Sequence, residues 1–229
     1  MDMLTFLLHN KAIIMKNKLI LLLLITPWCL IAQNKEKPRW NWGFFSGLDH
    51  QSIALETLGK IEPESPLAWS DGPKAGFSVG GFAQKAFLPW LYFQPEIGMS
   101  LVNQVINYRP DGPRSYRFMD IELPLHCKMV DPRKKNAPVR ACVIVGPRVG
   151  WNLFANSTSF LHINQERIAA DLGLGVEIKM KQWRIQPSFI YSHGLNDMHF
   201  PDQGKYDDLV GKIVRDKLTL KIACWMERK

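Results

Sequence analysis

Several side chains in the second half of the chain could take part in hydrolysis or acyl transfer. Ser192 and His193 are neighbours, and His162 and His199 fall at strand ends or in stretches between predicted strands. Such chemistry needs a nucleophile held beside a base. The sequence has no nucleophile elbow and no HExxH zinc motif. We therefore expect solvated histidines, no catalytic residues and no enzymatic activity.

His126 lies among ionisable residues at strand spacing, with Asp120, Glu122 and Lys128 on the same parity. This pattern favours an interior histidine with hydrogen-bond partners over a metal ligand. After residue 32 the chain has an odd number of cysteines, without CxxC spacing, which argues against a disulfide framework and against zinc. We expect no metal and no cofactor. The cysteines concerned are Cys127, Cys142 and Cys224.

Residues 168–180 alternate between two kinds of side chain, which predicts a β-strand with one apolar and one polar face. The apolar parity includes Leu172, Leu174 and Val176, and the polar parity includes Asp171 and Glu177. The pattern resumes after a short turn at 181–182, so the two segments form a hairpin.

The same alternation recurs and predicts eight strands. Long polar connections are expected between some of them, at 50–74, 104–115, 154–166 and 196–213, and short turns near 88–89, 131–138 and 181–182. This arrangement predicts an all-β fold, an eight-stranded antiparallel transmembrane β-barrel of the outer membrane, with both termini periplasmic. The strands are expected at 40–49, 75–87, 90–103, 116–130, 139–153, 168–180, 183–192 and 215–227.

A soluble sandwich or lipocalin-like barrel is the alternative. The predicted strands are about twice the usual five or six residues, and the glycines and charges of the polar face suit a crowded lumen. Both features favour the membrane barrel. Prolines inside the strands indicate bulges or kinks, or strands that are shorter than drawn. They are Pro95, Pro124, Pro147 and Pro187.

Residues 1–32 resemble a secretory signal, with Met15 as an alternative start. Lys16 and Lys18 precede an apolar run, and Ala32 suits cleavage before Gln33. The predicted domains are a signal peptide over 1–32 and a barrel over 33–229. The excess of basic residues is modest and accompanies no nucleic-acid motif, so no nucleic-acid partner is expected.

The polar parity would direct many charges into a narrow lumen, where unpaired charges are strongly disfavoured. We therefore predict a cross-barrel network, in which Glu122 and Glu177 each lie near Arg148, Arg184 or Lys221. Its role would be structural: it would plug the lumen and fix the shape of the barrel. The residues assigned to it are Glu96, Asp120, Glu122, Lys128, Arg140, Arg148, Asp171, Glu177, Lys179, Arg184, Lys217 and Lys221.

Several blocks of the chain resemble the PorT family, small outer-membrane β-barrel proteins of Bacteroidetes linked to type IX secretion. They are "FQPEIG", "IELPL", "DLGLGVE", "QPSFIYSHGLND" and "LTLKIACWME". The first three are shared with a broader outer-membrane barrel family. The ending departs from a common aromatic–Glu finish, because Met226 stands before Glu227. The resemblance covers about 75–227 and implies no catalytic residues.

Three functions follow. The resemblance implies a component supporting type IX protein secretion through protein–protein contacts, with outer-membrane lipid and other secretion-apparatus proteins as partners. The alternatives are a structural or adhesive outer-membrane barrel and a lipid-modifying barrel enzyme. No small-molecule substrate is indicated. An eight-stranded lumen filled with side chains cannot pass a folded protein, so a protein-conducting pore is not expected.

Overall fold

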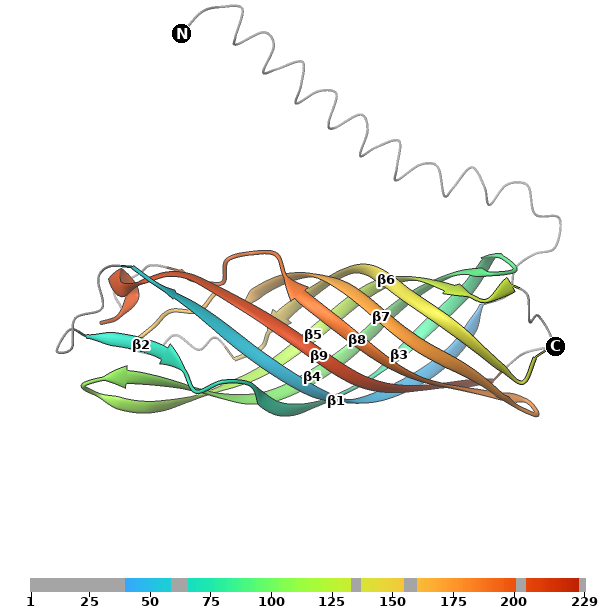
Figure 1. Ribbon diagram of the computed structural model, residues 1–229, viewed down its shortest axis with the longest axis horizontal. Coiled ribbons are helices and arrows are strands. Elements are labelled where there is room, and N and C mark those ends of the chain that lie inside the picture. The colour runs from blue at the N-terminus through green and yellow to red at the C-terminus, as the bar shows by residue number, and fades with distance from the viewer. Residues whose placement is uncertain (1–39, 59–65, 133–136, 155–159, 201–204, 227–229) are drawn as a thin grey trace, which may run out of the picture. The chain divides into compact units, whose positions relative to one another are not determined.

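The computed structural model describes residues 40–58, 66–132, 137–154, 160–200 and 205–226. In these residues long antiparallel strands wrap around one barrel (Figure 1). A short strand, β2 (Leu67–Ser70), pairs with β4 beyond the end of β3. The long strands are β1 (Asn41–Thr57), β3 (Lys74–Leu88), β4 (Leu91–Arg109), β5 (Gly112–Val130), β6 (Val139–Asn152), β7 (Glu166–Met180), β8 (Trp183–Gly194) and β9 (Val210–Met226).

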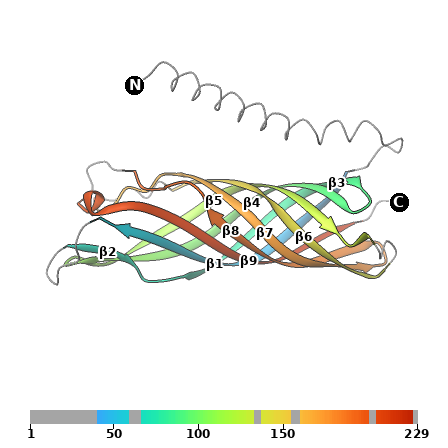
Figure 2. The ribbon, with the colours of Figure 1, turned by 45° about the horizontal axis from the view of Figure 1, so that its top comes forward.

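The long strands close into a ring, and Figure 2 shows the barrel from a second side. β1 pairs with both β9 and β3, and β4 pairs with β5, so the ring runs β1–β3–β4–β5–β6–β7–β8–β9 and returns to β1. This confirms the predicted all-β, eight-stranded antiparallel barrel. In such a ring β5 lies opposite β9. The described residues include no helix with the length and hydropathy needed to span a membrane.

The two ends of the barrel differ. The first and last strands meet where Gly43 pairs with Trp225, at the end that also carries the β3–β4 and β7–β8 turns. We call this the turn end. The opposite end, where the β4–β5 hairpin turns at residues 110–111, is the loop end.

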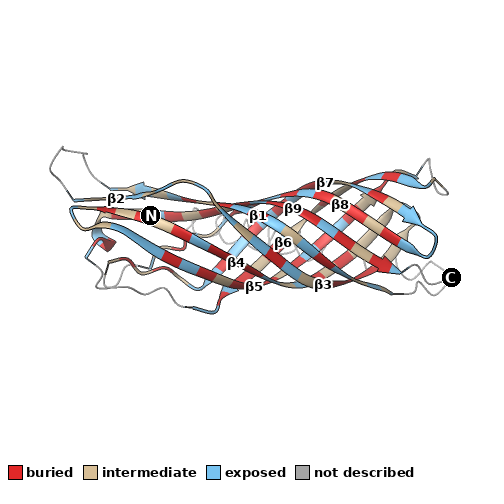
Figure 3. Cartoon of the chain, turned by 90° about the horizontal axis from the view of Figure 1, so that it is seen from below, coloured by how far each residue is buried: buried red, intermediate tan, exposed pale blue. Residues whose placement is uncertain are grey.

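Buried and exposed residues alternate along the strands, as the bands in Figure 3 show. On β7, Leu172 and Leu174 are 59% and 65% exposed, whereas Asp171 and Glu177 are buried. An apolar outside around a charged inside reverses the order of a soluble protein and suits a barrel surrounded by lipid. The charges of the polar parity therefore point into the lumen.

The apolar outer band matches the hydrocarbon layer of a membrane in height. On β4 it covers residues 91–101 and on β5 residues 119–129, before polar Asn103 and Arg117 follow. A strand segment of this length, tilted by about 40°, rises roughly 25–30 Å. A bilayer core is about 30 Å thick. Exposed tryptophans edge the band at the turn end: Trp40, Trp42, Trp90 and Trp183.

Proline lies within four of the long strands and ends none of them. The β3–β4 ladder skips Pro95, β4–β5 skips Pro124, β5–β6 skips Pro147 and β7–β8 skips Pro187. Each ladder resumes in the same register, and each proline is paired on its other side. Because proline lacks only its own N–H, the loss is confined to one ladder. The expected bulges or shortened strands are therefore wrong, and short gaps take their place.

One of these gaps brings two strands unusually close. A Cβ added at Gly146 would lie 2.1 Å from the carbonyl oxygen of Leu125 and 3.0 Å from the Cα of His126. Only glycine fits such an approach of one backbone to another. Gly146 thus allows β6 to approach β5 beside the gap at Pro147.

At the loop end the strands continue beyond the lipid band and enclose a second, apolar core. The predicted polar loop at 104–115 is instead the end of the β4–β5 hairpin, β1 continues to Thr57, and β9 begins at Val210. These bounds correct the predicted connections. We call this part the loop-end cap. Its buried core is formed by Ile53, Ala68, Val102, Ile106, Tyr108, Tyr116, Phe118, Leu161, Ile163, Met198, Tyr206, Val210 and Ile213.

Candidate functional site

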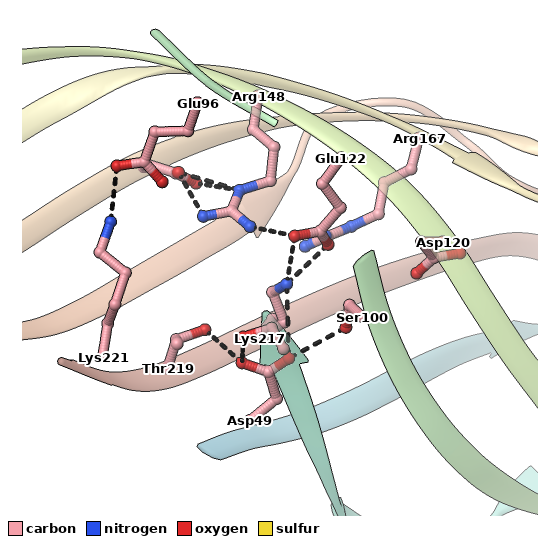
Figure 4. Close-up of polar contacts among 12 residues, drawn as sticks. Asp49, Glu96, Ser100, Asp120, Glu122, Arg148, Arg167, Lys217, Thr219 and Lys221 are labelled. Carbon is pink, nitrogen blue, oxygen red and sulfur yellow. Dashed lines mark hydrogen bonds and ion pairs between the residues drawn. The ribbon is translucent and has the colours of Figure 1, made fainter. Parts of the chain in front are cut away.

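Polar side chains fill the middle of the barrel, and Glu122 of β5 is at their centre (Figure 4). Lys217 Nζ of β9 donates to both carboxylate oxygens of Glu122 at 2.6 Å. Arg148 Nη1 of β6 donates to Glu122 Oε2, and Arg167 Nη1 of β7 lies 3.4 Å from Oε1. One buried carboxylate therefore joins four strands.

Arg148 extends these contacts to a second carboxylate. Its Nη2 donates to Asp171 Oδ2 at 2.7 Å. The ring of His126 lies between Asp171 Oδ2 and Glu96 Oε1, at 2.7 and 3.1 Å. Lys221 Nζ donates to Glu96 Oε1 at 2.7 Å. His126 is thus an interior hydrogen-bond partner of two carboxylates, as its spacing predicted.

Two further carboxylates complete the set. Asp49 accepts from Thr219 at 2.7 Å, from Ser100 at 2.9 Å and from Ser78 at 3.2 Å. Asp120 accepts from Arg215 Nη2 across the lumen. We call the whole group the lumen network. It consists of Asp49, Glu96, Asp120, Glu122, His126, Arg148, Arg167, Asp171, Arg215, Lys217 and Lys221.

A separate group lies nearer the turn end and centres on Glu177. Its Oε1 lies 2.8 Å from Lys128 Nζ, and its Oε2 accepts from Arg140 Nη2 at 2.5 Å and from Arg184 Nη1 at 3.3 Å. Lys128 also donates to Gln84. We call Lys128, Arg140, Glu177 and Arg184 the turn-end cluster.

The loop-end cap is tied together by polar contacts at its tip. Tyr206 donates to Asp111 Oδ2 at 2.7 Å, and the carbonyl oxygen of Arg109 lies 3.0 Å from the same hydroxyl. Lys205 Nζ donates to Asp111 at 2.6 Å. These hydrogen bonds hold the pKa of the Asp111 carboxyl below its ordinary value. Burial and the neighbouring carboxylate raise the pKa of Tyr206 to about 12.

The sequence-predicted charges can now be placed one by one. Glu96, Asp120, Glu122, Arg148, Asp171, Lys217 and Lys221 lie in the lumen network, and Lys128, Arg140, Glu177 and Arg184 lie in the turn-end cluster. Glu122 contacts Arg148 and Glu177 contacts Arg184, as predicted.

The prediction that Lys179 belongs to the network in the lumen is wrong. Lys179 is exposed, next to the β7–β8 turn, because the strict alternation of β7 ends after Glu177. Three buried charges of the lumen network escaped the sequence prediction: Asp49, Arg167 and Arg215. Each stood at or just beyond the end of a predicted strand, on the parity that faces the lumen. Predicted strands as long as β1, β7 and β9 would have included these three residues among the inward-facing charges.

The residues considered for catalysis are dispersed. Ser192 and His193 lie within β8 rather than in a loop, and they face opposite sides of the barrel wall. His162 and His199 flank the buried Asp207 of the cap, at 2.9 and 3.6 Å. The described parts of the chain contain no group of three or more residues suited to hold a metal ion. The proposed signal at 1–32 lies outside the described residues.

An eight-stranded ring that is apolar outside and charged inside defines a small outer-membrane β-barrel protein. The family model for the outer membrane protein beta-barrel domain matches residues 31–199, and the chain belongs to this family. A search of curated proteins finds no match.

Solved structures of small outer-membrane proteins are similar at low identity. OprG from Pseudomonas aeruginosa is 11% identical with a TM-score of 0.49, covering 83% of this chain and 96% of its own. Neisserial surface protein A is 11% identical with a TM-score of 0.44, covering 80% and 95%. Ail of Yersinia pestis is 10% identical with a TM-score of 0.40, covering 82% and 98%. The family assignment rests on the family model alone.

Proposed function

We propose that this chain supports protein secretion as a PorT-like outer-membrane component that acts through contacts with other proteins. The observation that carries the proposal is the filled interior. The turn-end cluster, the lumen network and the core of the loop-end cap follow one another along the barrel. A polypeptide has no path through them, so a role in secretion falls to the outer surfaces.

The resemblance to the PorT family supports the secretion role. It covers about residues 75–227, from β3 to β9, and includes the "FQPEIG" block of β4 and the "LTLKIACWME" block of β9; that family is linked to type IX secretion. Short turns of bacterial outer-membrane barrels are periplasmic and the longer loops extracellular. On this pattern the turn end would meet periplasmic components of the apparatus.

A second candidate, an adhesive barrel, is favoured by the exposed aromatic side chains at the loop end. Trp69 is 44% exposed, Phe154 49% and Phe200 57%. Aromatic residues on a rigid, packed support are typical of protein-binding surfaces. A lipid-modifying enzyme has less support, because Ser192 and His193 face opposite sides of β8.

Deletion of the gene and measurement of secreted proteins test the proposal. Loss of secretion that is restored by the wild-type chain supports it. A strain that secretes normally but no longer adheres to its surroundings would support the second candidate instead. Complementation with Lys181→Glu at the turn end and with Trp69→Ala at the loop end separates the two surfaces. Secretion should respond to the first change and adhesion to the second.

A further inference from the structure

A groove follows the outer face of β3 near the turn end. Gly81 and Ala83 of β3 form its floor, Trp42 of β1 lines one side, and Pro95 and Ile97 of β4 line the other. Trp42 pairs with Ala83 and Ile97 pairs with Gly81, and both large side chains are exposed. The groove has a volume of about 540 Å³, and pockets for small organic ligands measure roughly 300–1,000 Å³.

Packing does not explain why Gly81 lacks a side chain. A Cβ added at Gly76 or Gly80 of the same strand would lie 2.4 or 2.3 Å from a carbonyl oxygen of β4, so both positions require glycine. A Cβ added at Gly81 would meet only the carbonyl oxygen of Gly43, at 3.6 Å, which is an ordinary contact. Glycine also weakens the interior of a strand. What Gly81 provides is therefore the open floor of the groove.

The groove opens toward hydrocarbon. Pro95 and Ile97 belong to the apolar outer band, which covers residues 91–101 of β4. Water that entered an apolar groove at this depth would find too few hydrogen-bond partners. A hydrocarbon chain needs none, and it contacts the aromatic and aliphatic walls. The occupant that suits the groove is therefore an acyl chain.

Lys85 stands at the turn end of the groove. It follows Gly81 and Ala83 on the outward parity of β3, about 13 Å from Gly81 along the strand. It pairs with Phe93 of the apolar band, and its Nζ lies 5.6 Å from the centre of the Trp40 ring. Among the residues that the structure describes, Lys85 has no carboxylate partner. A lysine beside hydrocarbon is costly unless its ammonium group reaches the polar headgroups.

We propose that the groove and Lys85 form a binding site for one phospholipid, with an acyl chain over Gly81 and the phosphate at Lys85. Lysine binds phosphate as a point charge. Trp40 lies at the same edge of the band, where tryptophan is typical of the membrane interface. An apolar segment of another protein would fill the groove but leave Lys85 without a counter-charge. The inference goes beyond the proposed secretion role and does not depend on it.

The test uses protein purified from outer membranes, in micelles of an uncharged detergent, and counts bound lipids by native mass spectrometry. Phosphatidylglycerol with one palmitoyl and one oleoyl chain is the probe, and diacylglycerol with the same chains is its counterpart without phosphate. We expect one phosphatidylglycerol to bind saturably, and diacylglycerol to bind at least about tenfold more weakly, because a charge-assisted contact is lost. Equal binding of both lipids, or uptake without saturation, would overturn the proposal.

Variants locate the site. Gly81→Leu fills the floor of the groove and Lys85→Gln removes the charge, so each should weaken phosphatidylglycerol binding at least about tenfold. Two controls alter the opposite side of the ring: Ala170→Leu on the outward face of β7, and Lys181→Gln at the β7–β8 turn. Both should bind as the wild type does.

Heat-modifiable migration on a denaturing gel shows whether each variant is folded. The ordinary contact at the Gly81 Cβ position predicts that Gly81→Leu folds. Binding at the wild-type level in folded Gly81→Leu or Lys85→Gln would contradict the proposal. The comparison of the two lipids on the wild-type protein decides the matter even if Gly81→Leu does not assemble.

Discussion

Lys217 and Glu122 stand on opposite walls of the barrel, and the ammonium group of Lys217 donates to both carboxylate oxygens at 2.6 Å. Three strands separate β9 from β5 in either direction around the ring. Ladder hydrogen bonds join only neighbouring strands. The pair instead fixes the distance between walls that the ladders leave free, and so contributes to the cross-section of the barrel.

Asp120 and Arg215 link the same two strands and offer a test of this cross-bracing. Asp120→Asn should lower the free energy of unfolding by about 3–5 kcal/mol, because it leaves the buried Arg215 without its counter-charge. Asp120→Asn combined with Arg215→Met should cost less than the single change. Urea unfolding followed by tryptophan fluorescence measures both. Glu166→Gln, at an exposed strand end, is the control and should change little. A double variant less stable than Asp120→Asn would contradict the cross-bracing.

Leu174 tests the lipid-facing parity. It is 65% exposed on β7, and Leu174→Arg should destabilise the barrel in vesicles by about 2–4 kcal/mol if it lies near the bilayer midplane. Gln182→Arg, at the exposed β7–β8 turn, should be tolerated. The difference is measured as the shift in unfolding between the two variants. Equal stability would place Leu174 outside the hydrocarbon.

Gly146→Val tests the close approach of β5 and β6. A Cβ there meets the backbone of Leu125, which cannot rotate away, so the variant should assemble poorly. The fraction of heat-modifiable protein on a denaturing gel reports assembly. Gly72→Val is the spatial control, because nothing lies within 4 Å of its Cβ position, although its positive φ adds some strain. Better assembly of the Gly146 variant than of the Gly72 variant would contradict the crowding.

Asp111 anchors the tip of the loop-end cap. Asp111→Asn should increase hydrogen exchange in residues 104–115 and leave the lipid-spanning strands unchanged. Asp216→Asn removes a similar exposed pair, with His193 of β8, and serves as the control, because neither residue belongs to the β4–β5 hairpin. Since the folded chain lowers the pKa of Asp111, its contribution is present above the ordinary carboxyl pKa, near 3.9, and is lost as the pH falls below it. Unchanged exchange at the tip in Asp111→Asn would show that the anchor contributes nothing.

A filled lumen should also be electrically silent. Purified protein in planar bilayers should give no large, steady conductance, because ion pairs and buried side chains occupy the interior. A stable conductance of the size of a general porin would rule out the arrangement described for the lumen network.

The strands within the lipid band were predictable, because lipid and lumen impose opposite demands on alternate residues. The predicted segments 139–153 and 168–180 closely match β6 and β7 for this reason. The inward charges followed from the same parity. The prediction that Lys179 faces the lumen is wrong, because alternation no longer indicates direction where a strand extends beyond both the lipid and the lumen.

The loop-end cap was not predictable from this pattern, because the pattern reverses there. On β4, apolar Leu101 faces outward, whereas apolar Ile106 and Tyr108 farther along face inward. The phase changes where lipid gives way to water, since the apolar side must then turn toward the interior. In the sequence a continuous strand therefore resembles a strand followed by a loop, and the pattern predicts a loop at residues 104–115 where the β4–β5 hairpin continues.

The distribution of counter-charges also bears on how the barrel is completed during assembly. β9 brings Arg215, Lys217 and Lys221, which pair with Asp120, Glu122 and Glu96 on strands β5 and β4. A chain that has formed every strand but this one exposes acidic groups to an open, incomplete interior. Arrival of β9 neutralises them in the same step that joins it to β1 and seals the wall. The final strand thus supplies the missing counter-charges in the step that closes the barrel, and pairing of β9 in a shifted register would move those charges away from their acids.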